Sequence, residues 1–273
     1  MLGMRTYKLN NGLEMPRLGL GVWKSDNGQE TVNAIHWALE AGYRHVDTAK
    51  IYKNEEAVGE AIQTASLPRE EVWLTTKIWN DAIREGRTTQ ALDNSLKRLK
   101  TDYVDLVLLH WPVSGRVKAW QELEKAVEEG KVRSIGLSNF MEEHVQEILD
   151  GGNITPAVNQ IEYHPYLTQA DAISICDAND IAITAWSPLM QGNFLQEPLF
   201  AEIGKRYDKT AAQVVLRWCL QNDVIVIPKS VNRGRIIENG QLFDFELSEE
   251  DMTAIDQLER DERFGPDPHN FDF

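Results

Sequence analysis

A repeated alternation of short apolar runs with longer amphipathic segments is the feature that most constrains this chain. Eight runs are too brief for helices, and several are β-branched and almost continuously apolar. Strands buried on both faces have this character, because a parallel sheet covered by helices leaves neither face in water. The runs span residues 18–21, 44–47, 72–76, 104–109, 132–136, 157–160, 181–185 and 224–227.

The segments between the runs show helical spacing of apolar residues. Within 89–99, for example, Leu92, Leu96 and Leu99 fall on one face. Ser248 has the residue type of an N-cap and is followed by Asp251 in the first turn. We therefore expect helices over 29–41, 89–99, 118–129, 142–149, 169–178, 211–220 and 248–258, and a longer loop with a short helical segment near 190–209.

Eight strand–helix units predict an α/β fold of the (β/α)8 TIM-barrel type, formed by one domain over residues 1–273. A doubly wound sheet also alternates strands and helices, but the count of eight and the lack of a linker favour the barrel. Before the first unit, residues 7–15 predict an N-terminal β-hairpin around Asn10-Asn11-Gly12, which would cover the barrel as a lid or plug. The segment 248–258 would be an extra C-terminal helix.

The composition limits the classes of partner. A formal net charge of −15 repels nucleic acid and anionic membranes, so an anionic ligand needs a local basic site. No apolar run approaches the roughly 18 residues of a membrane-spanning helix, and the N-terminus lacks the apolar stretch of a signal peptide. We expect a cytoplasmic monomer without nucleic-acid or membrane partners, with Cys176 and Cys219 as buried, reduced thiols.

Polar and aromatic residues follow the predicted strands, at the end where barrel enzymes carry their chemistry. Four of them ionise: Asp47, Tyr52, Lys77 and His110. A lysine within about 4 Å of a tyrosine would stabilise the phenolate by roughly 4 kcal/mol before screening and lower the pKa of the tyrosine. Asp47 would hold Lys77, and His110 could orient a carbonyl oxygen. Each residue alone has an ordinary structural explanation, but the set suits proton delivery to a substrate that receives a hydride.

Several motifs of other enzyme classes fail. Gly19-Leu20-Gly21 begins like a dinucleotide-binding fingerprint, but Lys24 replaces its last glycine. The segment 136–140 resembles a nucleophile elbow until Phe140 takes the place of glycine. No His-Glu-x-x-His motif or cluster of carboxylates at strand ends is present, so no metal site is expected.

Five separated motifs together resemble the aldo-keto reductases. They are GYRHVDTA at 42–49 followed by Tyr52, TK at 76–77, LHWP at 109–112, IGLSNF at 135–140 and IPKS at 227–230. The resemblance extends from about Tyr7 to the tail, and within the family it points to bacterial glyoxal and methylglyoxal reductases, 2,5-diketogluconate reductases and prostaglandin F synthase-like members. It implies a (β/α)8 barrel and an oxidoreductase that uses NADPH.

The resemblance also implies residue roles. Tyr52 would be the general acid, tuned by Lys77 and Asp47, and His110 would orient the carbonyl. Implied NADPH contacts are Ser138, Asn139 and Gln160 with the carboxamide, Trp186 (tyrosine in many relatives) with the nicotinamide ring, Ser187 and Leu189 with the pyrophosphate, Lys229, Ser230 and Arg235 with the 2′-phosphate, and Glu238 and Asn239 with the adenine. The segment 231–235 departs from the usual pattern, which often has proline and glutamate before the arginine.

Trp23, Trp79 and Trp111 would line the substrate pocket together with His110. The chain lacks the long C-terminal extension of some relatives, which implies a smaller or more open pocket. The expected activity is reduction of small aldehydes, α-dicarbonyls such as glyoxal and methylglyoxal, or related ketones. An alternative is a cofactor-binding regulatory subunit of the potassium-channel β type without significant turnover. A barrel hydrolase or isomerase stays open only if the resemblance misleads.

Overall fold

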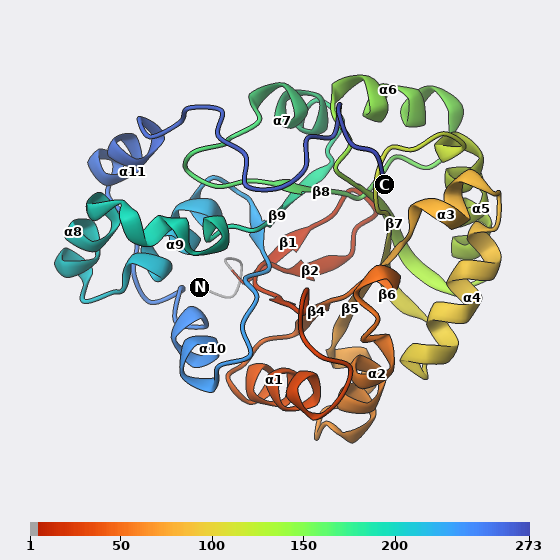
Figure 1. Cartoon of the computed structure of the whole chain (residues 1–273), viewed down its shortest axis with the longest axis horizontal. Helices are drawn as coiled ribbons and strands as arrows, with labels where there is room; N and C mark the ends of the chain where they lie inside the picture. Colours follow the sequence, from red (N-terminus) through yellow and green to blue (C-terminus); the bar gives the residue numbers. More distant parts are fainter. Residues whose placement is uncertain (1–4) are drawn as a thin grey trace.

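The computed structural model describes residues 5–273 and consists of a ring of parallel strands surrounded by helices (Figure 1). Eight strands pair in sequence order, and bridges from Leu18 to Val226 and from Gly21 to Lys229 join the last strand to the first. The predicted barrel is therefore confirmed. Its strands are β3 (Leu20–Gly21), β4 (His45–Asp47), β5 (Trp73–Ile78), β6 (Val104–Leu109), β7 (Val132–Ser138), β8 (Val158–Glu162), β9 (Ala182–Trp186) and β10 (Ile225–Val226).

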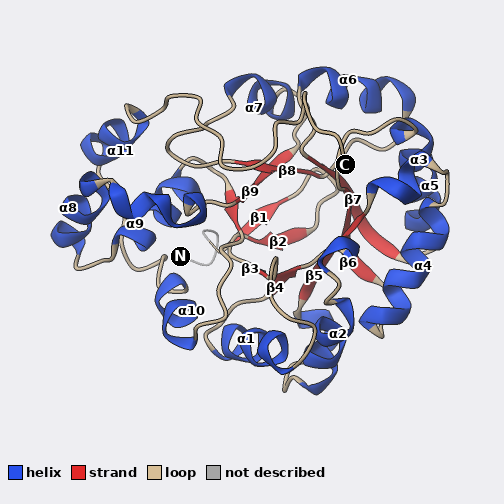
Figure 2. Ribbon diagram, viewed as in Figure 1, coloured by secondary structure: helices blue, strands red, loops and turns tan. Residues whose placement is uncertain are grey.

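Helices form the outer ring (Figure 2), and their apolar faces cover the outside of the barrel. The helices are α1 (Gln29–Glu40), α2 (Glu55–Thr64), α3 (Asn80–Arg84), α4 (Thr88–Leu99), α5 (Arg116–Glu128), α6 (Glu142–Gly151), α7 (Ala170–Asp177), α8 (Pro198–Tyr207), α9 (Ala211–Gln221), α10 (Arg233–Asn239) and α11 (Glu249–Asp256), with short 3-10 segments η2 (Lys50–Tyr52), η3 (Arg69–Glu71) and η4 (Met190–Gln196). Ser248 caps α11 by accepting a hydrogen bond from the Asp251 N–H, as its sequence position predicts.

The N-terminal hairpin closes one end of the barrel. Strands β1 (Thr6–Lys8) and β2 (Glu14–Pro16) pair antiparallel, and Gly12 turns the chain with a φ of +84°. Leu9 and Met15 pack against the barrel-interior residues Leu106 and Ile225. The hairpin is thus a plug at the amino ends of the strands, which leaves the carboxyl ends free for a site.

Three helices were not predicted: α2, α3 and α10. The buried face of α2 is built largely from Ala57, Val58 and Ala61, whose small side chains give a weak apolar pattern. Helix α8 corresponds to the short helical segment expected near 190–209; it begins at Pro198, and Glu197 caps it by accepting from the Leu199 N–H. Helices α3 and α10 have 5 and 7 residues, too few for a periodic pattern.

Both cysteines are free and buried, Cys176 on α7 and Cys219 on α9, as predicted. Burial raises the pKa of the Cys176 thiol to about 12, so it stays protonated. Among the helices of residues 5–273, none combines the length and apolar character needed to cross a membrane.

Candidate active site

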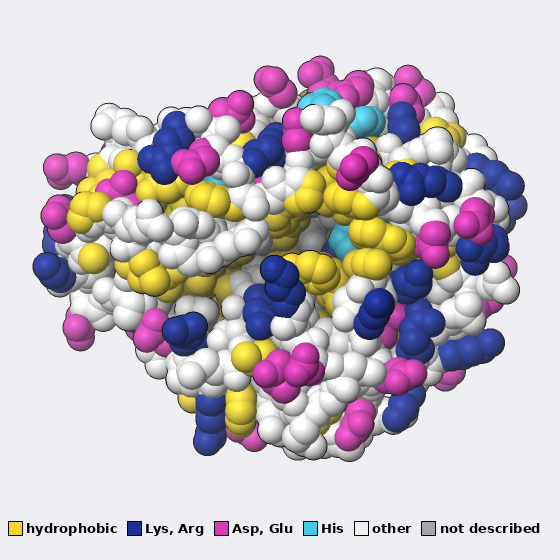
Figure 3. All heavy atoms as spheres, viewed as in Figure 1, with side chains coloured by type: hydrophobic (Ala, Val, Ile, Leu, Met, Phe, Trp, Pro, Cys, Tyr) yellow, Lys and Arg dark blue, Asp and Glu magenta, His cyan; other side chains and the backbone are white. Residues whose placement is uncertain are grey.

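A cavity of about 920 Å³ opens at the carboxyl ends of the strands. Figure 3 shows it as a central hollow rimmed by hydrophobic side chains, with Lys and Arg side chains at its lower edge. Its lining includes Asp47, Tyr52, His110, Ser138, Asn139, Gln160, Trp186, Ser187, Leu189, Lys229, Ser230, Arg235, Glu238 and Asn239, together with Trp23, Trp79 and Trp111. Every candidate residue therefore borders one cavity except Lys77, which lies behind Asp47 and Tyr52.

Asp47, Lys77 and Tyr52 form one hydrogen-bonded chain. Asp47 ends β4 and Lys77 lies near the end of the neighbouring strand β5, so the sheet brings the two side chains together. The Lys77 ammonium donates to Asp47 Oδ1 at 2.5 Å and to the Thr48 carbonyl at 3.0 Å, and its Nζ lies 3.2 Å from the Tyr52 hydroxyl. Tyr52 comes from η2, directly after β4, and its ring lines the cavity.

The protonation states of this chain follow from burial and charge. Burial lowers the pKa of Lys77, but the Asp47 carboxylate and Tyr52 raise it by more, so the ammonium persists. For Tyr52, burial raises the pKa above its usual value, although Lys77 opposes the shift. The expectation that Lys77 lowers the pKa of Tyr52 below normal is therefore wrong for this structure, because the cost of burying the phenolate exceeds the attraction of the ammonium.

His110 lies at the end of β6, with its ring between two aromatic residues. Its centroid is 5.9 Å from that of Tyr52 and 5.1 Å from that of Trp79, both in edge-on geometry. Burial, and then the Lys77 charge, hold the pKa of His110 well below its usual range. The imidazole is therefore neutral at pH 7, borders the cavity and has one N–H that can donate a hydrogen bond.

A second network lies at the ends of β7, β8 and β9. Gln160 Nε2 donates to Asp47 Oδ2 at 2.8 Å, which links this network to the Asp47–Lys77–Tyr52 chain. Asn139, with a φ of +63°, donates to the His110 carbonyl at 3.0 Å and accepts from Trp186 Nε1 at 2.8 Å. Asn139 also donates to Ser138 Oγ at 3.2 Å. These contacts fix the side chains of one cavity wall.

The far end of the cavity carries a local positive group. Lys229 and Ser230 follow β10, and Arg235 lies in the first turn of α10, whose N-cap Asn232 accepts from the Arg235 N–H. Arg233, the third cation of this segment, lies 3.7 Å from Glu40 on α1 and does not line the cavity. Lys229 and Arg235 therefore face this end of the cavity in a protein whose net charge is −15, as an anionic ligand requires.

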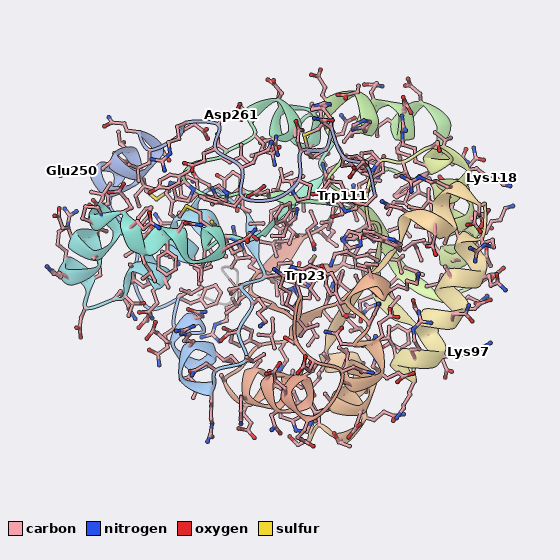
Figure 4. All side chains as sticks on the ribbon, in the orientation of Figure 1. Trp23, Lys97, Trp111, Lys118, Glu250 and Asp261 are labelled. Atoms are coloured by element: carbon pink, nitrogen blue, oxygen red, sulfur yellow. The ribbon has the colours of Figure 1, made fainter. Side chains whose placement is uncertain are left out.

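Aromatic residues form the opposite wall. Figure 4 shows Trp23 and Trp111 near the centre of the view, whereas the labelled charged residues lie at the periphery. The Trp23 ring lies 4.8 Å from Tyr52 between centroids, and the Phe273 ring stacks on Trp79 at 5.7 Å. The C-terminal tail thus narrows the pocket that the three tryptophans form.

Several lining residues were missed by the sequence analysis. They come mainly from segments whose path cannot be read from a pattern: Lys24, Ile51, Pro188, Gln191, Gly192, Phe194, Leu195, Thr210, Ala211, Ala212, Gly265, Pro266 and Phe273. The sequence position of Lys24 could have indicated it, because Lys24 closely follows the first strand and is adjacent to Trp23, which was predicted to line the pocket. For the tail, only the aromatic residues Phe271 and Phe273 in an irregular segment could have suggested contact with the pocket.

Comparison with known proteins defines the family. The model of the Aldo/keto reductase family matches residues 17–260, and the chain belongs to this family. It is 49% identical to the glyoxal reductase of Bacillus subtilis, over 96% of each chain. It is 47% identical to the methylglyoxal reductase DkgA of Yersinia pestis, over 97% of this chain and 96% of that protein.

A solved structure gives the same result for the fold. An aldo-keto reductase from a Medee basin deep-sea metagenome library superimposes with a TM-score of 0.94 at 40% sequence identity, covering 98% of this chain and 100% of that one. The protein is therefore an oxidoreductase of the aldo/keto reductase family, with reductases of small carbonyl compounds among its relatives.

Proposed function

We propose that this protein reduces small aldehydes and α-dicarbonyls such as glyoxal and methylglyoxal to alcohols, with NADPH as reductant and Tyr52 as proton donor. The observation that carries the proposal is the Asp47–Lys77–Tyr52 chain, which presents a protonated hydroxyl to the cavity beside neutral His110. The glyoxal and methylglyoxal reductases among the relatives favour small dicarbonyl substrates.

The cavity fits a nicotinamide dinucleotide in shape and in its polar groups. It runs from Tyr52 to Arg235 and Glu238, so one elongated ligand could reach both ends. Ser138, Asn139 and Gln160 would hold a carboxamide, and the Trp186 indole would stack on the ring. Ser187 and Leu189 would lie along the pyrophosphate, and Glu238 and Asn239 would flank the adenine. Lys229, Ser230 and Arg235 would hold a 2′-phosphate, which favours NADPH over NADH. When bound, NADPH supplies the hydride.

The protein's own residues supply the proton. As negative charge develops on the carbonyl oxygen, the Tyr52 hydroxyl donates its proton to that atom and His110 donates a hydrogen bond to it. The phenolate left on Tyr52 is then stabilised by the Lys77 ammonium at 3.2 Å. Asp47 keeps this ammonium charged and in place. Because Tyr52 stays protonated at neutral pH, the donor is in the correct form before the substrate arrives.

The substrate would lie against Trp23, Trp79 and Trp111, with its carbonyl towards Tyr52 and His110. An aromatic wall narrowed by Phe273 suits small, uncharged carbonyl compounds.

A substrate panel tests the proposal. Enzyme, NADPH and either glyoxal, methylglyoxal or a series of aldehydes are mixed, and the absorbance of the reduced nicotinamide is followed, with NADH in parallel. We expect turnover with the dicarbonyls and a higher kcat/KM with NADPH than with NADH. Absence of turnover with every carbonyl of the panel would contradict the proposed function, and equal kcat/KM with both cofactors would contradict the role given to Arg235.

A further inference from the structure

Glu162 is a buried carboxylate immediately beside the proposed cofactor site. It ends β8, and the parallel register pairs it with Trp186, which ends β9. Its side chain is fully buried and does not line the cavity. A buried carboxylate requires hydrogen-bond donors, and those of Glu162 come mostly from the C-terminal segment more than a hundred residues further along the chain.

The Glu162 carboxylate fixes the backbone of residues 264–265. Oε1 accepts from the Phe264 N–H at 2.7 Å, and Oε2 accepts from the Gly265 N–H at 3.2 Å. The buried His164 places its Nε2 3.1 Å from Oε1, and so holds the carboxylate in orientation. On the other side of the segment, Gln191 Nε2 donates to the Phe264 carbonyl at 2.9 Å. Hydrogen bonds to a carboxylate are stronger than neutral ones, so the segment is held firmly.

Gly265 in turn lies directly on the Trp186 indole. A Cβ atom at this position would be 2.2 Å from Cη2 and 2.8 Å from Cζ3 of the indole, so a glycine is needed for the close approach. At its other edge, the indole donates from Nε1 to Asn139 at 2.8 Å. The ring is therefore held at both edges, by Asn139 and by the backbone that Glu162 fixes.

We propose that Glu162 is a positioning residue for cofactor binding: through Gly265 it fixes the Trp186 indole in the orientation that stacks on the nicotinamide ring. This inference rests on the proposed function, which gives Trp186 that stacking role. It predicts that Glu162 affects the nicotinamide half of NADPH and leaves the adenosine half, held about Arg235, unaffected. A carboxylate that served only to anchor the tail would affect neither half selectively.

Two ligands separate these cases. Titration calorimetry gives the Kd of NADPH and of 2′,5′-ADP, which carries the 2′-phosphate but no nicotinamide, for the wild type and for Glu162→Gln. We expect the NADPH affinity to fall about tenfold, the order of one aromatic stacking interaction, and the 2′,5′-ADP affinity to stay within about twofold. The single-turnover rate should fall as well, with little change in KM for methylglyoxal.

Glu259→Gln is the matched control. The Glu259 carboxylate also accepts from backbone, from the Asp261 N–H of the tail and from the Thr168 N–H, but neither hydrogen bond reaches Gly265 or Trp186. Its substitution should leave both affinities within about twofold of the wild type. An equal loss in Glu162→Gln and Glu259→Gln would overturn the proposal and show general tail anchoring.

A second variant keeps the proposal testable if Glu162→Gln folds poorly. Gly265→Ala places a methyl group against the indole and should produce the same selective loss of NADPH affinity. A phenylalanine at position 186 lacks the Cη2 and Cζ3 atoms that the new methyl group would contact. In the Trp186→Phe variant, Gly265→Ala should therefore change the NADPH affinity less than twofold. Loss of affinity for both ligands, or for neither, would overturn the role of Glu162. Failure of the proposed function would instead appear in the wild type, as absence of carbonyl reduction.

Discussion

The two ends of the barrel contain equally buried carboxylates with different surroundings. Near the amino ends of the strands, Asp105 accepts from Arg69, from Arg133 and from the Leu74 N–H, at 2.8 to 2.9 Å. At the carboxyl ends, Asp47 binds Lys77 and Gln160. The exposed fraction of both aspartate side chains is 2%.

The two aspartates differ in what their hydrogen-bond partners contact. The arginines of Asp105 extend towards solvent, with side-chain exposures of 19% and 42%, and the hairpin closes that end. Lys77 is completely buried, and one of its hydrogen-bond partners, Tyr52, faces the cavity. A buried charge alone therefore does not identify the active site. The active site is identified by a buried charge that hydrogen-bonds to a group on the open cavity. The closed end should contribute stability, and the open end chemistry.

Tyr52→Phe gives the largest expected effect at the open end. Removing the hydroxyl removes the proposed proton donor, so the single-turnover rate should fall about a thousandfold, within the usual range for general acids. The Kd of NADPH should stay within about twofold, because the hydroxyl does not belong to the cofactor contacts. A variant that retains substantial activity would remove Tyr52 from the mechanism.

Lys77→Met should lower the rate about a hundredfold, because the phenolate loses its neighbouring cation. It also leaves Asp47 buried without its ammonium partner, so the free energy of unfolding should fall by about 3 kcal/mol in a denaturant titration. The double variant Asp47→Asn with Lys77→Met should recover part of this stability without recovering the rate. Recovery of the rate would show that Lys77 acts only through folding.

Asp105→Asn tests the closed end. The substitution weakens two ion pairs with partly exposed arginines, and the free energy of unfolding should fall by about 2 kcal/mol. The kcat/KM for methylglyoxal should remain within about twofold under conditions where the protein is folded. A large loss of activity in the folded variant would contradict the division of labour between the two ends.

Arg235→Ala gives the smallest expected effect, confined to the anionic end of the cavity. The Kd of NADPH should rise about tenfold, because a guanidinium–phosphate contact is lost, and the Kd of NADH should change less than twofold. Arg233→Ala is the matched control, since Arg233 pairs with Glu40 outside the cavity. Equal effects of the two substitutions would mean that the local charge, and not a specific contact, attracts the cofactor.

The sequence was sufficient to predict the barrel and the residues at its strand ends. Asp47 ends one short apolar run, and Lys77 and His110 follow the next two; parallel pairing brings such positions to one rim whatever the details of packing. Gly265 and Phe273 could not be predicted, because the path of a tail depends on contacts such as that of Glu162, which join distant segments. The pKa of Tyr52 was misjudged for a related reason: a pairwise estimate includes Lys77 but not the burial of the ring.

The pH dependence of the single-turnover rate tests the central claim, that Tyr52 delivers the proton, most directly. A general acid must be protonated, so the rate falls as pH rises through its pKa. Burial raises the pKa of Tyr52 above the ordinary value of a tyrosine, and burial, followed by the Lys77 charge, holds the pKa of His110 well below that of an ordinary histidine. The rate of methylglyoxal reduction should therefore be flat from about pH 6.5 to 9.5. A tenfold fall per pH unit that begins near or below neutrality would identify a histidine as the acid and contradict the account.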